Sequence, residues 1–165
     1  MEFTDLESVY IENAKIVYKY LLHLSHDAGI AEELTQETFF QASKTMRKFR
    51  GDSKVSVWLC QIAKRIWYKQ LEKKKNNLLS IDDCYGLASD INIEDAYWKR
   101  EEKILLYRAI HLLKPLMREV VYLRLEDFSF KEIGEIVGES ENWARVNYYR
   151  ARQNISNIMK GADYE

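Results

Sequence analysis

The segment from Ser129 to Ile155 constrains the fold more than any other part of the chain. Its sequence, SFKEIGEIVGESENWARVNYYRARQNI, predicts two helices separated by a tight turn at Gly138. Ser129 and Glu132 have the spacing of a capping box that begins the first helix, and Ser140 is suited to the N-cap of the second. Two short helices joined in this way are typical of a helix-turn-helix.

The second of these helices has two chemically different sides. At 100° per residue, Ala144, Tyr148, Ala151 and Ile155 form one apolar stripe that is expected to face a core. The opposite side has the side chains of base and phosphate contact, with one apolar residue suited to a thymine methyl group. Its residues are Asn142, Arg145, Val146, Tyr149 and Arg150. Duplex DNA is the first partner that this pattern indicates, although an ordinary amphipathic helix with a solvated basic face remains the alternative.

The rest of the chain is also expected to be helical. Only one proline and six glycines interrupt its 165 residues. Apolar periodicity predicts helices over 6–26, 30–48, 57–74, 97–113 and 115–126, with a loop over 49–56. The stretch 76–96 has no clear period and is interpreted as a flexible acidic linker. The expected fold is therefore all-α, with two small helical domains, 1–75 and 97–165.

The formal net charge of −1 hides a strong asymmetry along the chain. Residues 44–76 carry 11 bases and 2 acids, whereas 1–43 carry 8 acids and 2 bases, and 77–103 carry 7 acids and 3 bases. Such blocks create separate local fields, and the basic one is suited to a polyanion.

An aromatic residue lies among the cations of this basic block. Trp58, Arg65 and Lys69 share one face of the helix at 57–74, and Phe49, Arg50 and Lys54 belong to the loop before it. Rings among cations suit single-stranded nucleic acid, because bases stack on rings while phosphates follow the charge. The alternative for Trp58 is packing against the helix at 30–48.

The sequence indicates no catalytic site, metal site or cofactor. The two cysteines are too few and too isolated for a metal cluster or a disulfide framework. His23, His26 and His111 have no cysteine or carboxylate at metal-ligand spacing, and no glycine-rich phosphate loop is present. Glu32, Glu33 and Glu37 are interpreted as a protein-binding or solvated surface. No secretory signal and no membrane span are expected, so a cytoplasmic location is the prediction.

Three segments, in order, make the chain resemble the extracytoplasmic-function (ECF) sigma factors, the smallest class of specificity subunits of bacterial RNA polymerase. AEELTQETFFQA at 31–42 resembles region 2.2 of that family. FRGDS followed by WLCQIAK, at 49–64, resembles regions 2.3 and 2.4. The segment at 112–152, LLKPLMREVVYLRLEDFSFKEIGEIVGESENWARVNYYRAR, resembles region 4.

The resemblance implies a transcription initiation factor that binds core RNA polymerase and selects promoters. It implies that one group of residues contacts the β′ clamp helices of the polymerase: Glu33, Leu34, Gln36 and Glu37. It implies that a second group binds the opened −10 element: Phe49, Arg50, Ser53, Lys54, Trp58, Arg65 and Lys69. It implies that the outer face of the last helix reads the −35 element as duplex: Asn142, Arg145, Val146, Tyr149 and Arg150.

Further partners follow from the same resemblance. The β flap of the polymerase is expected as a contact, with the linker running toward the RNA exit path. An anti-sigma factor is expected to hold the chain inactive, often at the membrane and until envelope stress releases it. No small-molecule substrate is implied.

Two positions depart from the family pattern. Members often have Asn where this chain has Arg65, and many have Thr and Val where it has Trp143 and Ala144. Arg65 is therefore expected to change how the opened strand is held, and Trp143 is expected to be a packing residue.

Two other functions are compatible with the residues alone. A stand-alone helix-turn-helix regulator would bind duplex DNA tightly without polymerase and would have no use for the basic helix at 57–74. A helical adaptor would use both basic faces to bind proteins.

Overall fold

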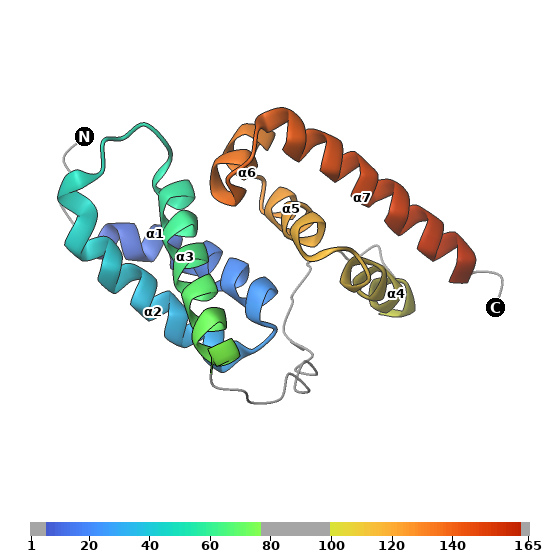
Figure 1. The fold of residues 1–165 in the computed structure, drawn as a ribbon, viewed down its shortest axis with the longest axis horizontal. Coiled ribbons are helices and arrows are strands. Elements are labelled where there is room, and N and C mark those ends of the chain that lie inside the picture. Colours follow the sequence, from blue (N-terminus) through green and yellow to red (C-terminus); the bar gives the residue numbers. More distant parts are fainter. Residues whose placement is uncertain (1–5, 77–99, 163–165) are drawn as a thin grey trace. The chain divides into compact units, whose positions relative to one another are not determined.

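A computed structural model of the protein describes residues 6–76 and 100–162, and all regular structure in those ranges is helical. The order is α1 (Leu6–Ser25), α2 (Ala28–Thr45), a 3-10 turn (Met46–Lys48), α3 (Val55–Asn76), α4 (Arg100–His111), α5 (Pro115–Leu125), α6 (Phe130–Val137) and α7 (Glu141–Ala162) (Figure 1). They form two compact units, α1–α3 and α4–α7. The expectation of an all-α chain with two helical domains is confirmed, while the predicted linker lies, beyond Asn76, outside the described residues.

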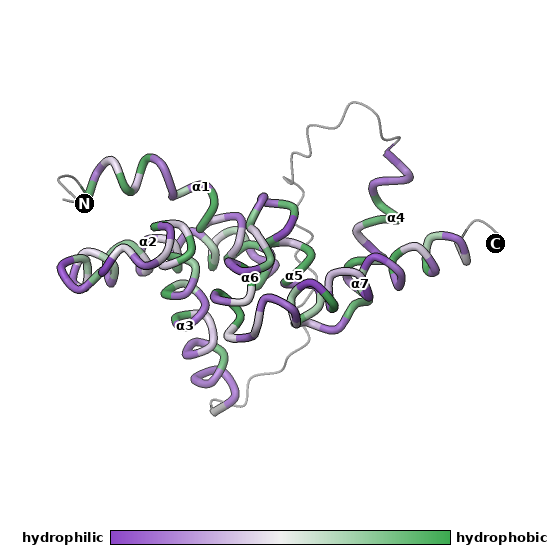
Figure 2. The backbone as a smooth tube through the Cα atoms, turned by 90° about the horizontal axis from the view of Figure 1, so that it is seen from above, coloured by the Kyte–Doolittle hydropathy of each residue, from purple (hydrophilic) through white to green (hydrophobic). Residues whose placement is uncertain are grey.

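The first unit is a bundle in which each of its three helices packs against the other two. The apolar period that predicts α3 gives it one buried stripe, which runs from Leu59 through Ile62 and Ala63 to Ile66. Val17 of α1 is also fully buried, and α1 packs against α3. Hydrophobic and hydrophilic residues alternate along these helices, as Figure 2 shows, because each helix has one side in the core and one side in solvent.

Two helices of the first unit begin earlier than predicted. The carboxylate of Asp27 accepts the backbone N–H of Ile30 at 2.9 Å, so α2 begins at Ala28, two residues earlier than expected. The helix α3 begins at Val55, also two residues early, with the N–H of Trp58 bonded to the carbonyl of Lys54. The loop is correspondingly shorter than predicted.

In the second unit, α7 packs against all three of the other helices. Its Ala151 is fully buried in a core with Ile110, Leu113, Val121 and Tyr122. Ile155, on the same stripe, packs against that core. The predicted inner stripe of the last helix is confirmed, and Pro115 opens α5 as expected because a first-turn residue needs no N–H donor.

The turn between α6 and α7 is defined by two glycines. Gly138 ends α6 with φ of 80°, a left-handed conformation that favours glycine. The carbonyl of Gly134 accepts the N–H groups of Gly138 and Glu139, each at 2.9 Å. A Cβ on Gly134 would lie 2.7 Å from the carbonyl oxygen of Glu139 and 3.0 Å from atoms of Ser140. The chain can therefore turn this closely only where residue 134 has no side chain.

This close approach predicts a large effect of one methyl group. Gly134→Ala should lower the free energy of unfolding of the second unit by about 1–3 kcal/mol, the range for overpacking, because backbone on both sides of the turn has to move. Urea denaturation of the purified chain measures it. Gly161→Ala is the matched control, since a Cβ there meets nothing within 4 Å and alanine favours the helix. Equal stability of the two variants would contradict the packing described for the turn.

Candidate nucleic-acid interface

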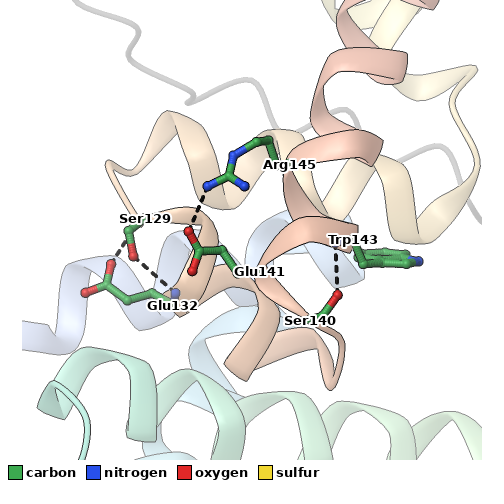
Figure 3. Close-up of polar contacts among 6 residues, drawn as sticks. All are labelled: Ser129, Glu132, Ser140, Glu141, Trp143 and Arg145. Carbon is green, nitrogen blue, oxygen red and sulfur yellow. Dashed lines mark hydrogen bonds and ion pairs between the residues drawn. The ribbon is translucent and has the colours of Figure 1, made fainter.

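Three capping contacts hold the starts of α6 and α7. Ser129 and Glu132 form the predicted capping box of α6, with the Ser129 hydroxyl accepting from Glu132 at 3.1 Å and the carboxylate accepting the Ser129 N–H at 2.7 Å. The Ser140 hydroxyl accepts the N–H of Trp143 at 3.0 Å, which confirms the predicted cap of α7. Figure 3 shows these contacts on the two helices that flank the turn. The first turn of α7 is therefore positioned by local hydrogen bonds rather than by core packing alone.

The predicted outer face of α7 is accessible. Tyr149 is 55% exposed and Val146 is 36% exposed, and Asn142 and Arg150 are exposed as well. Two apolar side chains thus remain in contact with solvent on a face that also carries a cation and an amide. The ring of Trp143 projects away from the side chain of Arg145, which places it off this face (Figure 3).

Arg145 differs from the other residues of this face, because it already has partners. Its Nη2 donates to Oε1 of Glu141 at 2.7 Å, and the two side chains are 44% and 49% exposed. Its guanidinium also lies 5.4 Å from the ring centre of Phe130. An ion pair this exposed contributes at most about 1 kcal/mol, so it orients the arginine without holding it firmly.

Phe130 connects several of these side chains. Its ring centre lies 5.5 Å from that of Tyr148 and 6.4 Å from that of Tyr149. The guanidinium of Arg124, from the end of α5, also lies 4.7 Å from the Phe130 ring centre. Neither Phe130 nor Glu141 was among the predicted site residues. The four-residue spacing of Glu141 and Arg145 could have indicated their ion pair, whereas the contacts of Phe130 depend on how the turn folds.

In the first unit, an aromatic pair lies among the predicted cations. The rings of Phe49 and Trp58 have centres 4.8 Å apart and are both half-buried, so Trp58 packs on the loop before α3. The side chains of Arg50, Lys54, Arg65 and Lys69 are exposed, and Ser53 is half-buried. The Nε of Arg65 donates to the carbonyl of Gln61 at 3.4 Å, one turn earlier in α3. Exposed charge beside paired rings is the chemistry that single-stranded nucleic acid requires.

The predicted protein-binding residues of α2 do not all lie on the surface. Glu33 and Gln36 are exposed, and Glu37 is partly exposed and accepts from Gln41 at 2.9 Å. Leu34, by contrast, is only 5% exposed. Its position on α2 turns it toward α1 and α3, so it packs in the core. The prediction that Leu34 belongs to the contact surface is therefore corrected.

The exposed face of α2 continues into an apolar groove that the sequence did not indicate. Phe40 is 54% exposed, with Nζ of Lys44 at 4.2 Å from its ring centre. The groove has a volume of about 420 Å³ and is lined by Leu6, Glu7, Tyr10, Phe39, Phe40 and Ser43. Exposed aromatic and aliphatic side chains that adjoin one another mark a surface for a partner.

The described residues contain no group of three or more histidine, cysteine or acidic side chains that could hold a metal ion. Burial, with His26 and Lys19 nearby, lowers the pKa of His23 to about 4, so this side chain is neutral at pH 7. Within 6–76 and 100–162, no helix is long and apolar enough to cross a membrane.

Comparison with known proteins identifies the two units. Residues 9–77 match the family described as Sigma-70 region 2, and residues 103–155 match Sigma-70, region 4. The chain belongs to the sigma-70 family. It is a transcription initiation factor, not an enzyme: sigma factors bind core RNA polymerase and direct it to promoters, recognising the −35 element as duplex and the −10 element as an opened strand.

Its relatives place it among the ECF sigma factors, a class of stress-response regulators. The chain is 28% identical over 151 residues to the ECF RNA polymerase sigma factor SigM of Bacillus subtilis (strain 168), covering 91% of this chain and 92% of that one. It is 28% identical over 165 residues to the RNA polymerase sigma factor YlaC of the same organism, covering 97% and 95%. The fold is shared with the sigma factor RpoE from Bartonella quintana, solved with the anti-sigma factor NepR. That match has a TM-score of 0.73 and 21% identity, and it covers 93% of this chain and 96% of the other.

Proposed function

We propose that three surfaces of this sigma factor divide the work of promoter recognition. The outer face of α7 reads the −35 duplex, the loop and α3 face from Phe49 to Lys69 hold the opened −10 strand, and α2 binds core polymerase. The observation that carries the proposal is the exposed, chemically mixed face of α7, which follows a turn whose geometry leaves no room for a side chain at Gly134.

The proposed −35 surface contains a donor or an apolar contact for each kind of group in a major groove. Arg145 and Arg150 can donate to guanine edges or to phosphates, and Asn142 can donate to a backbone oxygen at the start of the helix. Val146 and Tyr149 are exposed although they are largely apolar, and contact with thymine methyl groups or sugars would bury them. Contacts to phosphates and sugars would thus supply affinity, and contacts to base edges and methyl groups would supply sequence preference.

The proposed −10 surface suits a strand whose bases have left the duplex. Unstacking a base costs a few kcal/mol, which must be offset by new contacts. The Phe49–Trp58 pair offers aromatic surface, Arg50 and Lys54 add exposed positive charge in the loop beside it, and Lys69 adds exposed positive charge about three turns further along α3. Arg65 is bonded to its own helix in the free protein, so it would have to leave that 3.4 Å contact to reach a phosphate.

The proposed polymerase-binding surface combines the acidic side of α2 with the groove beside it. Glu33, Gln36 and Glu37 supply polar contacts, and Phe40 supplies an apolar anchor on the same side of the helix. A central aromatic residue with a polar rim is the arrangement that stable protein interfaces use. Phe40 takes the place in this surface that the buried Leu34 does not fill.

We also propose that the protein works in the cytoplasm and that an anti-sigma factor restrains it, with attachment to the membrane through that partner. The support is the ECF class itself and the solved sigma factor of similar fold, which was crystallised with an anti-sigma factor.

The −35 role predicts a position-specific loss. Arg145→Ala should reduce discrimination at one base pair of the −35 element by about 1–3 kcal/mol, the value of a bidentate arginine–guanine contact, and leave binding to core polymerase unchanged. Competition binding of the holoenzyme to single-base −35 variants measures it. Arg152→Ala, which removes the same charge two turns later, should weaken all sequences equally. Loss of core binding in Arg145→Ala would contradict the assignment of this face to DNA.

The polymerase-binding role predicts the reverse pattern. Glu37→Lys reverses a charge on the proposed surface, so binding to core polymerase should weaken at least about tenfold while the fold is retained. Titration of core polymerase with labelled sigma factor measures the affinity. Glu12→Lys makes the same charge reversal at an exposed position of α1, outside the proposed surface, and should leave the affinity near that of the wild type. Equal losses in the two variants would show that net charge, not this surface, determines binding.

A further inference from the structure

We infer that Glu141 and Phe130 are positioning residues that determine −35 specificity by holding Arg145 in the orientation that a guanine edge requires. Neither needs to touch DNA in this arrangement, since both act through the arginine. The inference rests on the proposed role of Arg145 in reading the −35 element.

The two residues contact Arg145 from different parts of the fold. Glu141 lies in the first turn of α7, one turn before Arg145, and the two side chains face each other (Figure 3). Acid before base at a spacing of four residues is the favourable order for an ion pair on a helix. Phe130 is the first residue of α6, and it reaches Arg145 only because the α6–α7 turn brings the two helix starts together.

These contacts leave most of the guanidinium free. An arginine has five N–H donors in one plane, and a single one, on Nη2, is bonded to Glu141 at 2.7 Å. Guanine presents two acceptors, O6 and N7, which a correctly oriented arginine can contact together. Because the side chain is already restricted, it loses less rotamer freedom when it makes this pair of bonds than an unrestrained arginine would.

The same carboxylate makes the wrong contacts less favourable. An unrestrained arginine can bind any nearby phosphate, which adds affinity for every sequence and preference for none. With Glu141 beside it, the guanidinium carries a partly neutralised charge and a preferred direction. Binding to phosphate is then weakened more than binding to a base edge, so discrimination increases.

Phe130 extends this support to a second outer-face residue. Its ring contacts Tyr149 as well as Arg145 and is half-buried, so it links two proposed DNA contacts to one packed side chain. A smaller side chain at position 130 would release both.

The test measures holoenzyme binding to a panel of single-base −35 variants. Glu141→Gln removes the negative charge that pairs with Arg145, and Glu141→Asp keeps the charge but shortens the side chain by one methylene group. Each should lower discrimination by up to about fivefold, the scale of an exposed ion pair, at the base pair that Arg145→Ala identifies and nowhere else. Glu139→Gln, an exposed acid in the turn before α7, should raise affinity for all sequences without changing their order.

A double substitution tests the positioning role of Glu141 separately from the −35 role of Arg145. In the Arg145→Ala background, Glu141→Gln should have no further effect on discrimination. A remaining effect would overturn the inference, because Glu141 would then contact the DNA itself, for example as an acceptor for cytosine. Wild-type discrimination in Glu141→Asp, or equal behaviour of Glu141→Gln and Glu139→Gln, would overturn it too, since charge alone would then suffice. If Arg145→Ala itself leaves discrimination unchanged, the proposed −35 role of Arg145 is what fails.

Discussion

The carbonyl of Gly134 sets the geometry on which the second unit depends. It accepts two N–H groups from the turn that follows α6, and the turn passes so close that no Cβ fits on residue 134. This contact sets where α7 begins relative to α6. The meeting of Phe130, at the start of α6, with Arg145 and Tyr149 on α7 follows from it. A backbone contact without any side chain thus determines how the proposed DNA-binding face is presented.

Most of the local structure could be predicted because its causes are local. The Ser129–Glu132 capping box, the Ser140 cap and the inner stripe of α7 each depend on residues within about two helical turns of one another. The buried stripe of α3 could also be predicted, because its apolar residues repeat with the 3.6-residue period of a helix. A local signal also explains the early start of α2, since Asp27 is an ordinary N-cap that the prediction overlooked.

The errors concern contacts between elements. Leu34 was assigned to the contact surface by the family motif, but it lies one turn before Thr38 on the side of α2 that is buried against α1 and α3. The exposure of Phe40 and the groove beside it depend on how α1 crosses α2, which no periodicity describes. The close approach at Gly134 depends on the path of the following turn, which the helical period does not describe. In each case the decisive neighbour lies on another helix or beyond a turn.

The division of the chain into two units explains its unusual charge distribution. The basic block of residues 44–76 belongs to the unit that is proposed to hold an opened strand, where phosphates are numerous and bases are read by stacking. The second unit carries less positive charge, and its proposed reading of duplex depends on a few oriented side chains. Weak individual contacts, such as the Glu141–Arg145 pair, are sufficient there because they adjust preference rather than total affinity.

Site-specific photocrosslinking in the holoenzyme tests the proposed division of labour most directly. A photoreactive amino acid would replace Tyr149 in one variant and Trp58 in another, on a promoter identified by mapping transcript starts after overexpression. The account predicts that position 149 crosslinks to the −35 duplex in both closed and open complexes. Position 58 should crosslink to the −10 region of the nontemplate strand only after the strands open. Crosslinks from both positions to the same element, or a crosslink from position 58 that is independent of opening, would contradict it.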